Sequence, residues 1–187
     1  YSKAEKQLGG VIDDTHWHLH YVRGMAYEQN NQWELAYNDL KRALEFRPNH
    51  PYLLNYLGYA LADRDLQLDD ALTMIKQALI QQPRDGFIKD SLGWVYYRLG
   101  RYDDAVPYLE QAVELEPADP IINDHLGDAY WQVNRKIEAR FQWMRAKDAA
   151  DDEALISALA DKIANGLVHD KVMQSALHDQ ASAPVSQ

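Results

Sequence analysis

Apolar residues in this chain follow a helical pattern that recurs with a nearly constant period. Leu53, Leu57 and Leu61 are spaced by four residues, and Leu54 lies beside them on the same side of an amphipathic helix. Glycines recur at intervals of 34, 35 and 34 residues, and two alanines follow each of them after a near-constant gap. A fixed period in this range is typical of a solenoid of stacked helical repeats. The repeating residues are Gly24, Gly58, Gly93 and Gly127, then Ala36, Ala71, Ala105 and Ala139, and finally Ala43, Ala78, Ala112 and Ala146.

Each repeat is expected to be a pair of helices joined by a short turn. Pro51 and Pro120 suit the first turn of a helix, where a missing N–H group has no intrahelical partner. Pairs such as Asn30-Asn31, Gly100-Arg101 and Asn134-Arg135 indicate turns. The second repeat is one residue longer, and we place the extra residue in the turn within Asp63–Leu68. The pattern predicts four repeats, at residues 17–50, 51–85, 86–119 and 120–153.

The recurring glycines predict close helix packing. A glycine inside a helix costs roughly 1 kcal/mol relative to alanine. Its presence in all four repeats suggests that the paired helix approaches too closely for a Cβ atom. The first alanine of each repeat, Ala36 in the first and its three equivalents, is expected to form the other side of that contact.

The two ends of the chain depart from the repeat pattern. Residues 1–16 carry apolar residues at helical spacing, as in the second helix of a truncated preceding repeat. An acidic start at Asp151-Asp152-Glu153 leads into an amphipathic segment, 154–170, whose spacing differs from that of a repeat and whose helix ends near Asn165-Gly166. We interpret this segment as a capping helix with a polar outer surface. Residues 171–187 are polar and are expected to be disordered.

Composition narrows the possible functions. The net charge of −10 disfavours nucleic acid and anionic membranes as main partners. The absence of cysteine excludes disulfides, thiolate catalysis and Cys-based zinc sites. The mean hydropathy is −0.53, and no apolar run approaches the ~20 residues of a transmembrane helix. Because the first residue is Tyr1, we expect a processed form or an excised fragment.

Three segments carry a resemblance to a known repeat family. They read Leu57-Gly58, Leu92-Gly93-Trp94-Val95-Tyr96 and Leu126-Gly127-Asp128-Ala129-Tyr130, and a proline closes each of the first three repeats. This order resembles the tetratricopeptide repeat (TPR) consensus over roughly residues 17–153. The resemblance implies an all-α, right-handed α-solenoid of antiparallel helix pairs, a TPR-like superhelix, with a C-terminal capping helix.

The resemblance also implies a concave groove lined by the first helix of each repeat. Seven of the twenty positions mapped to this groove are aromatic, against 11% of the whole chain. Large aromatic side chains are frequent anchors of binding hot spots. The alternative is that some of them pack against neighbouring repeats or the capping helix. The candidate groove residues are Tyr21, Tyr52, Asn55, Tyr59, Phe87, Asp90, Trp94, Tyr97, Arg98, Asp124, Asp128 and Trp131.

The charged groove positions predict the chemistry of the partner. Aspartates at Asp90, Asp124 and Asp128 favour an extended or helical peptide that carries basic residues among apolar ones. Alternatively, Arg98 neutralises one aspartate and the others are solvated. TPR proteins that bind acidic chaperone C-termini use Lys and Asn at the fifth and ninth groove positions. Only Asn55 fits that pattern here, so a carboxylate clamp is not expected.

Other constellations are interpreted as structural. In the run His16, His18 and His20, we expect His20 to pack in the core rather than to bind metal. The basic cluster on the second helix of the fourth repeat is interspersed with acids and is expected to be solvated. Aspartates in an open groove would lack the burial that shifts carboxylate pKa values, so neither an enzymatic activity nor a cofactor is expected. The cluster comprises Arg135, Lys136, Arg140, Arg145 and Lys147.

Two functions remain open. The first is a non-enzymatic scaffold or adaptor that binds a protein or peptide in the groove. The second is the structural end of a longer solenoid, which packs on its own upstream repeats or self-associates through the N-terminal half-repeat. Segments such as Leu54–Arg64, Asp90–Trp94 and Asn123–Ala129 resemble bacterial multi-TPR proteins, several of which are secreted or outer-membrane lipoproteins. This resemblance implies a periplasmic or outer-membrane location, with a cytoplasmic adaptor as the alternative.

Overall fold

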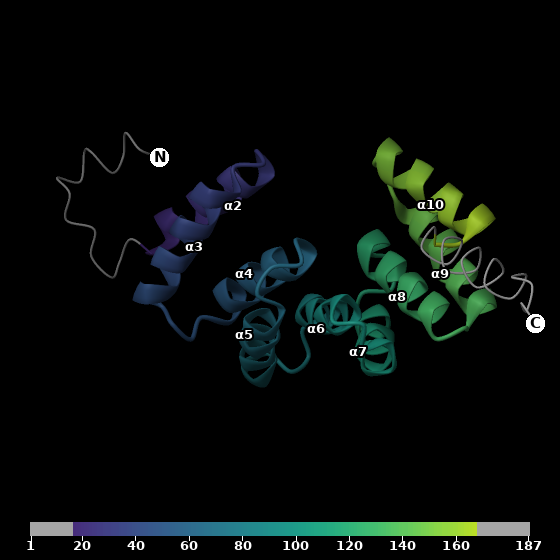
Figure 1. The fold of residues 1–187 in the computed structure, drawn as a ribbon, viewed down its shortest axis with the longest axis horizontal. Coiled ribbons are helices and arrows are strands. Elements are labelled where there is room, and N and C mark those ends of the chain that lie inside the picture. The colour runs from purple at the N-terminus through teal and green to yellow at the C-terminus, as the bar shows by residue number, and fades with distance from the viewer. Residues whose placement is uncertain (1–16, 168–187) are drawn as a thin grey trace, which may run out of the picture. The chain divides into compact units, whose positions relative to one another are not determined.

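The structure, a computed structural model, describes residues 17–167, and all regular secondary structure in that range is α-helical (Figure 1). The chain divides into two compact units, Tyr1–Arg101 and Tyr102–Gln187. The first unit contains α2 (Trp17–Gln29), α3 (Trp33–Phe46), α4 (Pro51–Asp63), α5 (Leu68–Gln81) and α6 (Gly86–Arg98). The second contains α7 (Tyr102–Leu115), α8 (Pro120–Gln132), α9 (Lys136–Ala149) and α10 (Glu153–Asn165).

The helices alternate between two lengths, as a two-helix repeat requires. The first helices α2, α4, α6 and α8 have 13 residues, and the second helices α3, α5, α7 and α9 have 14. The first helices begin at the four positions expected from the sequence. Asp85 and Asp119 cap α6 and α8 by accepting backbone N–H groups, and Pro51 and Pro120 open α4 and α8.

The extra residue of the second repeat lies in a turn, as predicted. Residues 64–67 separate α4 from α5, whereas the corresponding turns at 30–32, 99–101 and 133–135 are one residue shorter. Two residues of the longer turn adopt positive φ, Asp65 at 54° and Gln67 at 45°. The loop therefore absorbs the insertion without altering the length of either helix.

The recurring glycines lie where the paired helices approach closely. A Cβ atom on Gly58 would lie 2.7 Å from Cγ1 of Ile75 and 3.2 Å from the carbonyl oxygen of Ala71. At Gly127 the nearest atoms belong instead to the indole of Trp143, at 2.4 Å. The predicted glycine–alanine contact is thus confirmed for Gly58, whereas a tryptophan side chain fills the corresponding space at Gly127. All eight recurring alanines are completely buried.

The helix after the fourth repeat begins more regularly than the sequence suggested. α10 has 13 residues, and Asp152 caps it by accepting the backbone N–H of Leu155. Asp152 follows the equivalent cap Asp119 by 33 residues, and the fully buried Leu159 follows Leu126 by the same interval. The expectation that this segment has the wrong spacing for a repeat is therefore wrong. Its start resembles the first helix of a further repeat, one residue out of phase.

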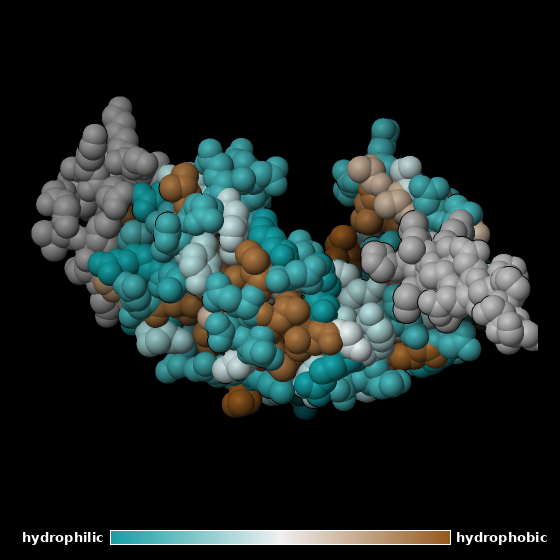
Figure 2. All heavy atoms as spheres, viewed as in Figure 1, coloured by the Kyte–Doolittle hydropathy of each residue, from teal (hydrophilic) through white to brown (hydrophobic). Residues whose placement is uncertain are grey.

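The surface is mainly polar. In the space-filling view, hydrophilic side chains cover most of the visible surface and hydrophobic ones form separate small patches (Figure 2). Within residues 17–167, none of the helices has the length and apolar character needed to cross a bilayer. The predicted helix in residues 1–16 and the predicted disordered tail at 171–187 lie outside the described residues.

Candidate functional site

In the first unit, three helices bring charged residues around the side chain of Tyr59. Tyr59 lies on α4, Glu28 on α2, and Asp90 and Arg98 on α6. Burial raises the pKa of the Tyr59 phenol, and the negative charges of Asp90, Asp63 and Glu28 raise it further. The candidate groove residues Tyr59, Asp90 and Arg98 are thus brought together as predicted.

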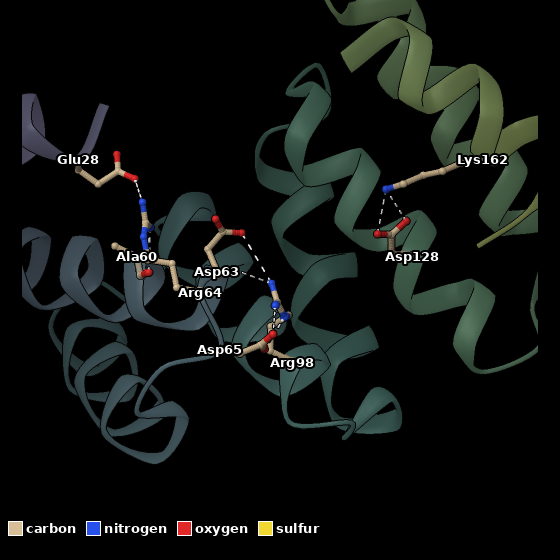
Figure 3. Close-up of polar contacts among 8 residues, drawn as sticks. All are labelled: Glu28, Ala60, Asp63, Arg64, Asp65, Arg98, Asp128 and Lys162. Carbon is tan, nitrogen blue, oxygen red and sulfur yellow. Dashed lines mark hydrogen bonds and ion pairs between the residues drawn. The ribbon is translucent and has the colours of Figure 1, made fainter. Parts of the chain in front are cut away.

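Arg64 connects two of these helices (Figure 3). Its guanidinium donates to Glu28 on α2 at 2.6 Å and to the carbonyl oxygen of Ala60 at 3.1 Å. The Tyr56 hydroxyl donates to the other oxygen of Glu28 at 3.3 Å. The same guanidinium lies 4.5 Å from the ring centre of Trp33, in a cation–π contact. Sequence reasoning did not identify this network, because Arg64 lies just beyond the end of its helix.

Arg98 holds the turn between α4 and α5 against α6 (Figure 3). It donates to the carboxylate of Asp65 at 2.9 Å and to the backbone carbonyl of Asp63 at 2.9 Å. The prediction that Arg98 neutralises an aspartate is confirmed, although the main partner is Asp65 and not a groove residue. Next to it, the rings of Trp94 and Tyr97 stack with their centres 4.9 Å apart and 6° between their planes.

The aromatic candidates of the first unit differ in exposure. Phe87 is 53% exposed and Tyr52 is 48% exposed, whereas Trp94 is buried at 9%. Tyr21 and Tyr97 are half-buried. Near them, the side-chain oxygen of Asn55 is buried with no hydrogen-bond partner among the described residues. The two open rings therefore come from consecutive first helices, α4 and α6.

In the second unit, the acidic candidates are already occupied. The ammonium group of Lys162 on α10 lies 2.7 and 2.8 Å from the carboxylate oxygens of Asp124 on α8. It also lies 2.8 and 2.9 Å from those of Asp128 (Figure 3). The indole N–H of Trp143 donates to Asp128 at 2.9 Å. One lysine therefore neutralises part of an acidic pair that was expected to be solvated.

The pKa values reflect this burial. Burial, together with the nearby charge of Asp124, raises the pKa of Asp128 to about 6. The pKa of Lys162 is also raised, because the two carboxylates outweigh the cost of burying the ammonium group. The expectation that these aspartates lack the burial that shifts carboxylate pKa values is wrong for Asp128. The sequence held one signal of this contact, since Lys162 follows Asp128 by 34 residues, the repeat period.

Trp131 is enclosed by its own unit. It is 7% exposed, and its ring centre lies 5.3 Å from that of Trp143. Lys136 and Arg140 lie over the ring at 3.9 and 5.0 Å from its centre. Gly166, with φ of 73°, passes so close to the indole that a Cβ atom there would lie 2.0 Å from a ring carbon. In the described arrangement, α9 and the end of α10 cover the ring that was predicted to contact a partner.

His20 is a core residue, as predicted. It is buried, and its Nδ1 atom lies 3.0 Å from the Asp39 carboxylate, which also accepts a hydrogen bond from Arg23 at 2.6 Å. Burial alone would raise the pKa of Asp39, but the hydrogen bonds and charges of Arg23 and His20 hold it below its usual value. This cluster joins α2 to α3. His18 is exposed, and His16 lies outside the described residues.

Two other surface features lie away from the predicted groove. A cavity of about 370 Å³ is lined mainly by residues of α3 and α5, among them Tyr37, Leu44 and Met74. The basic residues of α9 are partly engaged, since Arg140 donates to the Ile163 carbonyl at 3.0 Å and Arg145 to that of Pro117 at 2.9 Å.

Comparison with known proteins identifies the family. Tetratricopeptide repeat sequence models match residues 17–50 and 91–154. The chain belongs to the tetratricopeptide repeat family. A TPR repeat-containing protein of Pseudomonas aeruginosa is 37% identical over 83 residues, and the Lipoprotein NlpI homolog of Haemophilus influenzae is 30% identical over 96 residues. These matches cover 44% and 51% of this chain but only 14% and 30% of the two relatives.

Solved structures confirm the TPR fold. MamA from Desulfovibrio magneticus RS-1 matches 87% of this chain and 89% of its own, with a TM-score of 0.63 at 22% identity. PilF of Pseudomonas aeruginosa matches 89% of this chain and 76% of its own, with a TM-score of 0.60 at 18% identity. At such identities the likeness concerns the fold alone. The protein is thus an all-α TPR solenoid, a fold that serves as a scaffold for protein interactions.

Proposed function

We propose that the first unit binds a protein or peptide segment on its aromatic face, defined as Tyr21, Tyr52, Tyr59, Phe87, Trp94 and Tyr97. The observation that carries this proposal is the pair of open rings, Tyr52 and Phe87, beside the acidic surroundings of Tyr59. A ring left half-exposed on each of two consecutive helices offers an apolar anchor to a partner.

The charges near Tyr59 favour a partner with basic residues. Four carboxylates, those of Glu28, Asp63, Asp65 and Asp90, accompany only two guanidinium groups, those of Arg64 and Arg98. The remaining negative charge attracts Lys or Arg side chains, increases the association rate and disfavours acidic partners. The partner is therefore a segment in which basic residues alternate with apolar ones, as the sequence alone suggested.

The second unit supports the same preference by analogy. Asp124 and Asp128 hold a lysine of this chain with four contacts of 2.9 Å or less. For them to contact a partner, Lys162 would have to leave both carboxylates. We therefore assign partner binding to the aromatic face, and not to Asp124, Asp128 or Trp131.

A peptide array tests this assignment. Immobilised peptides of matched apolar content, with either Lys or Glu at the intervening positions, are probed with the labelled protein. We expect binding to the Lys series, and a loss of about 2 kcal/mol or more in the Tyr52→Ala, Phe87→Ala double variant. Ile80→Ala is the matched control, because Ile80 on α5 is 81% exposed and lies outside the aromatic face. Equal binding of both series, or an undiminished double variant, would remove the aromatic face as the recognition surface.

The proposed role is that of a non-enzymatic adaptor. TPR relatives of this kind are scaffolds, and the matched Lipoprotein NlpI homolog favours a place in the bacterial envelope for this chain too. The alternative function, self-association through residues 1–16, predicts a molar mass in light scattering that rises with concentration and falls back on substitution of Leu8 and Ile12. The adaptor function predicts a constant mass.

A further inference from the structure

The outward side of α9 carries an apolar stripe that the repeat does not require. Ile137, Phe141 and Met144, spaced by four and three residues, are 84%, 54% and 45% exposed. This spacing places them in one line along the helix. We define these three residues as the α9 stripe. Three large apolar side chains in one exposed line are uncommon on a solvated helix and mark a surface that binds another element.

The other second helices show that this surface is normally polar. At the positions equivalent to Ile137, Phe141 and Met144, α3, α5 and α7 carry mostly charged or polar side chains, and eight of these nine residues are exposed. The fold therefore places these positions in water and gains nothing from apolar residues there. The equivalents are Glu34, Asn38 and Lys41 on α3, Asp69, Thr73 and Lys76 on α5, and Asp103, Pro107 and Glu110 on α7.

The charges of α9 also differ from those of the other second helices. α9 carries four basic and two acidic side chains, whereas acids outnumber bases in α3, α5 and α7. By helical spacing, Arg140 and Lys147 flank one side of the stripe and Arg145 flanks the other. Glu138 lies on that second side, but its charge is paired with Arg135 at 3.1 Å. Asp148 lies beyond Met144 at the C-terminal end of the stripe.

From this charge pattern we infer that the α9 stripe is a docking surface for an amphipathic helix of a partner protein whose apolar residues are flanked by Asp or Glu. An apolar line seven residues long matches two turns of a partner helix. The basic flanks select acidic partners in a chain whose net charge is −10. This surface is separate from the aromatic face, which favours basic segments, so the two interactions recognise opposite charges.

A pair of designed peptides tests the inference. The probe is an 18-residue fluorescent helix with Leu at three- and four-residue spacing and Glu on both flanks, and the control replaces every Glu by Lys. We expect the full chain to bind the Glu-flanked peptide at least tenfold more tightly than the Lys-flanked one by fluorescence anisotropy at low salt. Phe141→Glu should weaken binding at least tenfold. Ile137→Glu should do the same without affecting folding, because Ile137 is 84% exposed.

Matched variants separate this docking from other uses of the stripe. Ile80→Glu adds the same charge at an 81% exposed position of α5 and should leave peptide binding unchanged. Lys147→Glu should weaken binding several-fold and reduce its dependence on salt. Equal binding of the two peptides, or unchanged binding by Phe141→Glu and Ile137→Glu, would overturn the inference. So would tighter probe binding after Met173→Glu and Leu177→Glu, or a dimer that Ile137→Glu dissociates, since the occupant would then be this chain itself.

Discussion

Replacing Lys162 by methionine should detach α10 from the second unit in a pH-dependent manner. The substitution keeps the length of the side chain but removes the only ammonium group described next to Asp124 and Asp128. The side chain of Lys162 is 22% exposed, and those of the two aspartates are 14% and 8% exposed. Methionine therefore leaves two carboxylates close together in a poorly hydrated place without a counter-charge.

The magnitude follows from the burial of these groups. Removing one partner of a buried ion pair costs about 3–5 kcal/mol, because the remaining charge is left unpaired. Since Lys162 is partly exposed, we expect a loss of about 2–4 kcal/mol in the free energy of unfolding at pH 8. At pH 8 the pKa of Lys162, which is raised, keeps the ammonium charged in the wild type, so the whole interaction is present before substitution.

The pH dependence has a definite sign. The pKa of Asp128 is raised to about 6 in the folded chain, against about 3.9 for an unfolded aspartate. Between these values the folded state binds more protons, so the contribution of Asp128 to stability is complete below about pH 4 and is lost as the pH rises through 6. Without Lys162 the folded pKa rises further, so the loss in Lys162→Met should be larger at pH 8 than at pH 4.5.

Denaturant unfolding at both pH values, followed by circular dichroism, measures these losses. Hydrogen exchange of the α10 amides reports separately whether that helix detaches first, which matters because repeat proteins need not unfold in one step. Lys147→Met, at an exposed position of α9, should change stability by less than about 0.5 kcal/mol. An equal loss at pH 4.5 and pH 8, or α10 amides as protected as in the wild type, would refute the buried-pair explanation.

Three further outcomes are expected. Gly58→Leu should destabilise by about 1–3 kcal/mol in thermal unfolding, because its first side-chain atom would overlap Ile75; an unchanged melting temperature would contradict the close contact. Gly166→Ala should cost more than Gly100→Ala, since both glycines have φ near +70° but only Gly166 lies against Trp131; equal melting temperatures would contradict this. Asp39→Asn should destabilise above pH 4 and progressively less as the pH falls through the lowered pKa of Asp39, which parallel acid titrations of both proteins would show.

The repeat could be predicted from the sequence because its signals are local. The period fixed the starts of the helices, and the longer second repeat fixed the turn that contains Asp65 and Gln67. Glycine and alanine report close packing because only small residues fit there, so the contact between Gly58 and Ala71 could be anticipated. No more than the side chains of one repeat is needed for such predictions.

Contacts made by long side chains could not be predicted in the same way. Glu28 and Arg64 are separated by 36 residues, and Asp124 and Lys162 by 38. Neither spacing equals the repeat period, and flexible side chains can reach several partners from the same backbone position. The family pattern indicated which positions point toward the groove, but it could not show that the chain itself would fill two of them.

The occupancy by Lys162 bears on how the two units divide the work of binding. The first helix of the second unit is engaged by α10, so its acidic pair serves folding, whereas in the first unit Tyr52 and Phe87 stay open. The surface that the second unit leaves available is instead on its second helix, where Phe141 and its neighbours are exposed. If the two surfaces act independently, substitutions on one should not alter binding at the other, and their effects should add. A scaffold with one face for basic segments and another for acidic helices can hold two different partners at once without direct contact between them.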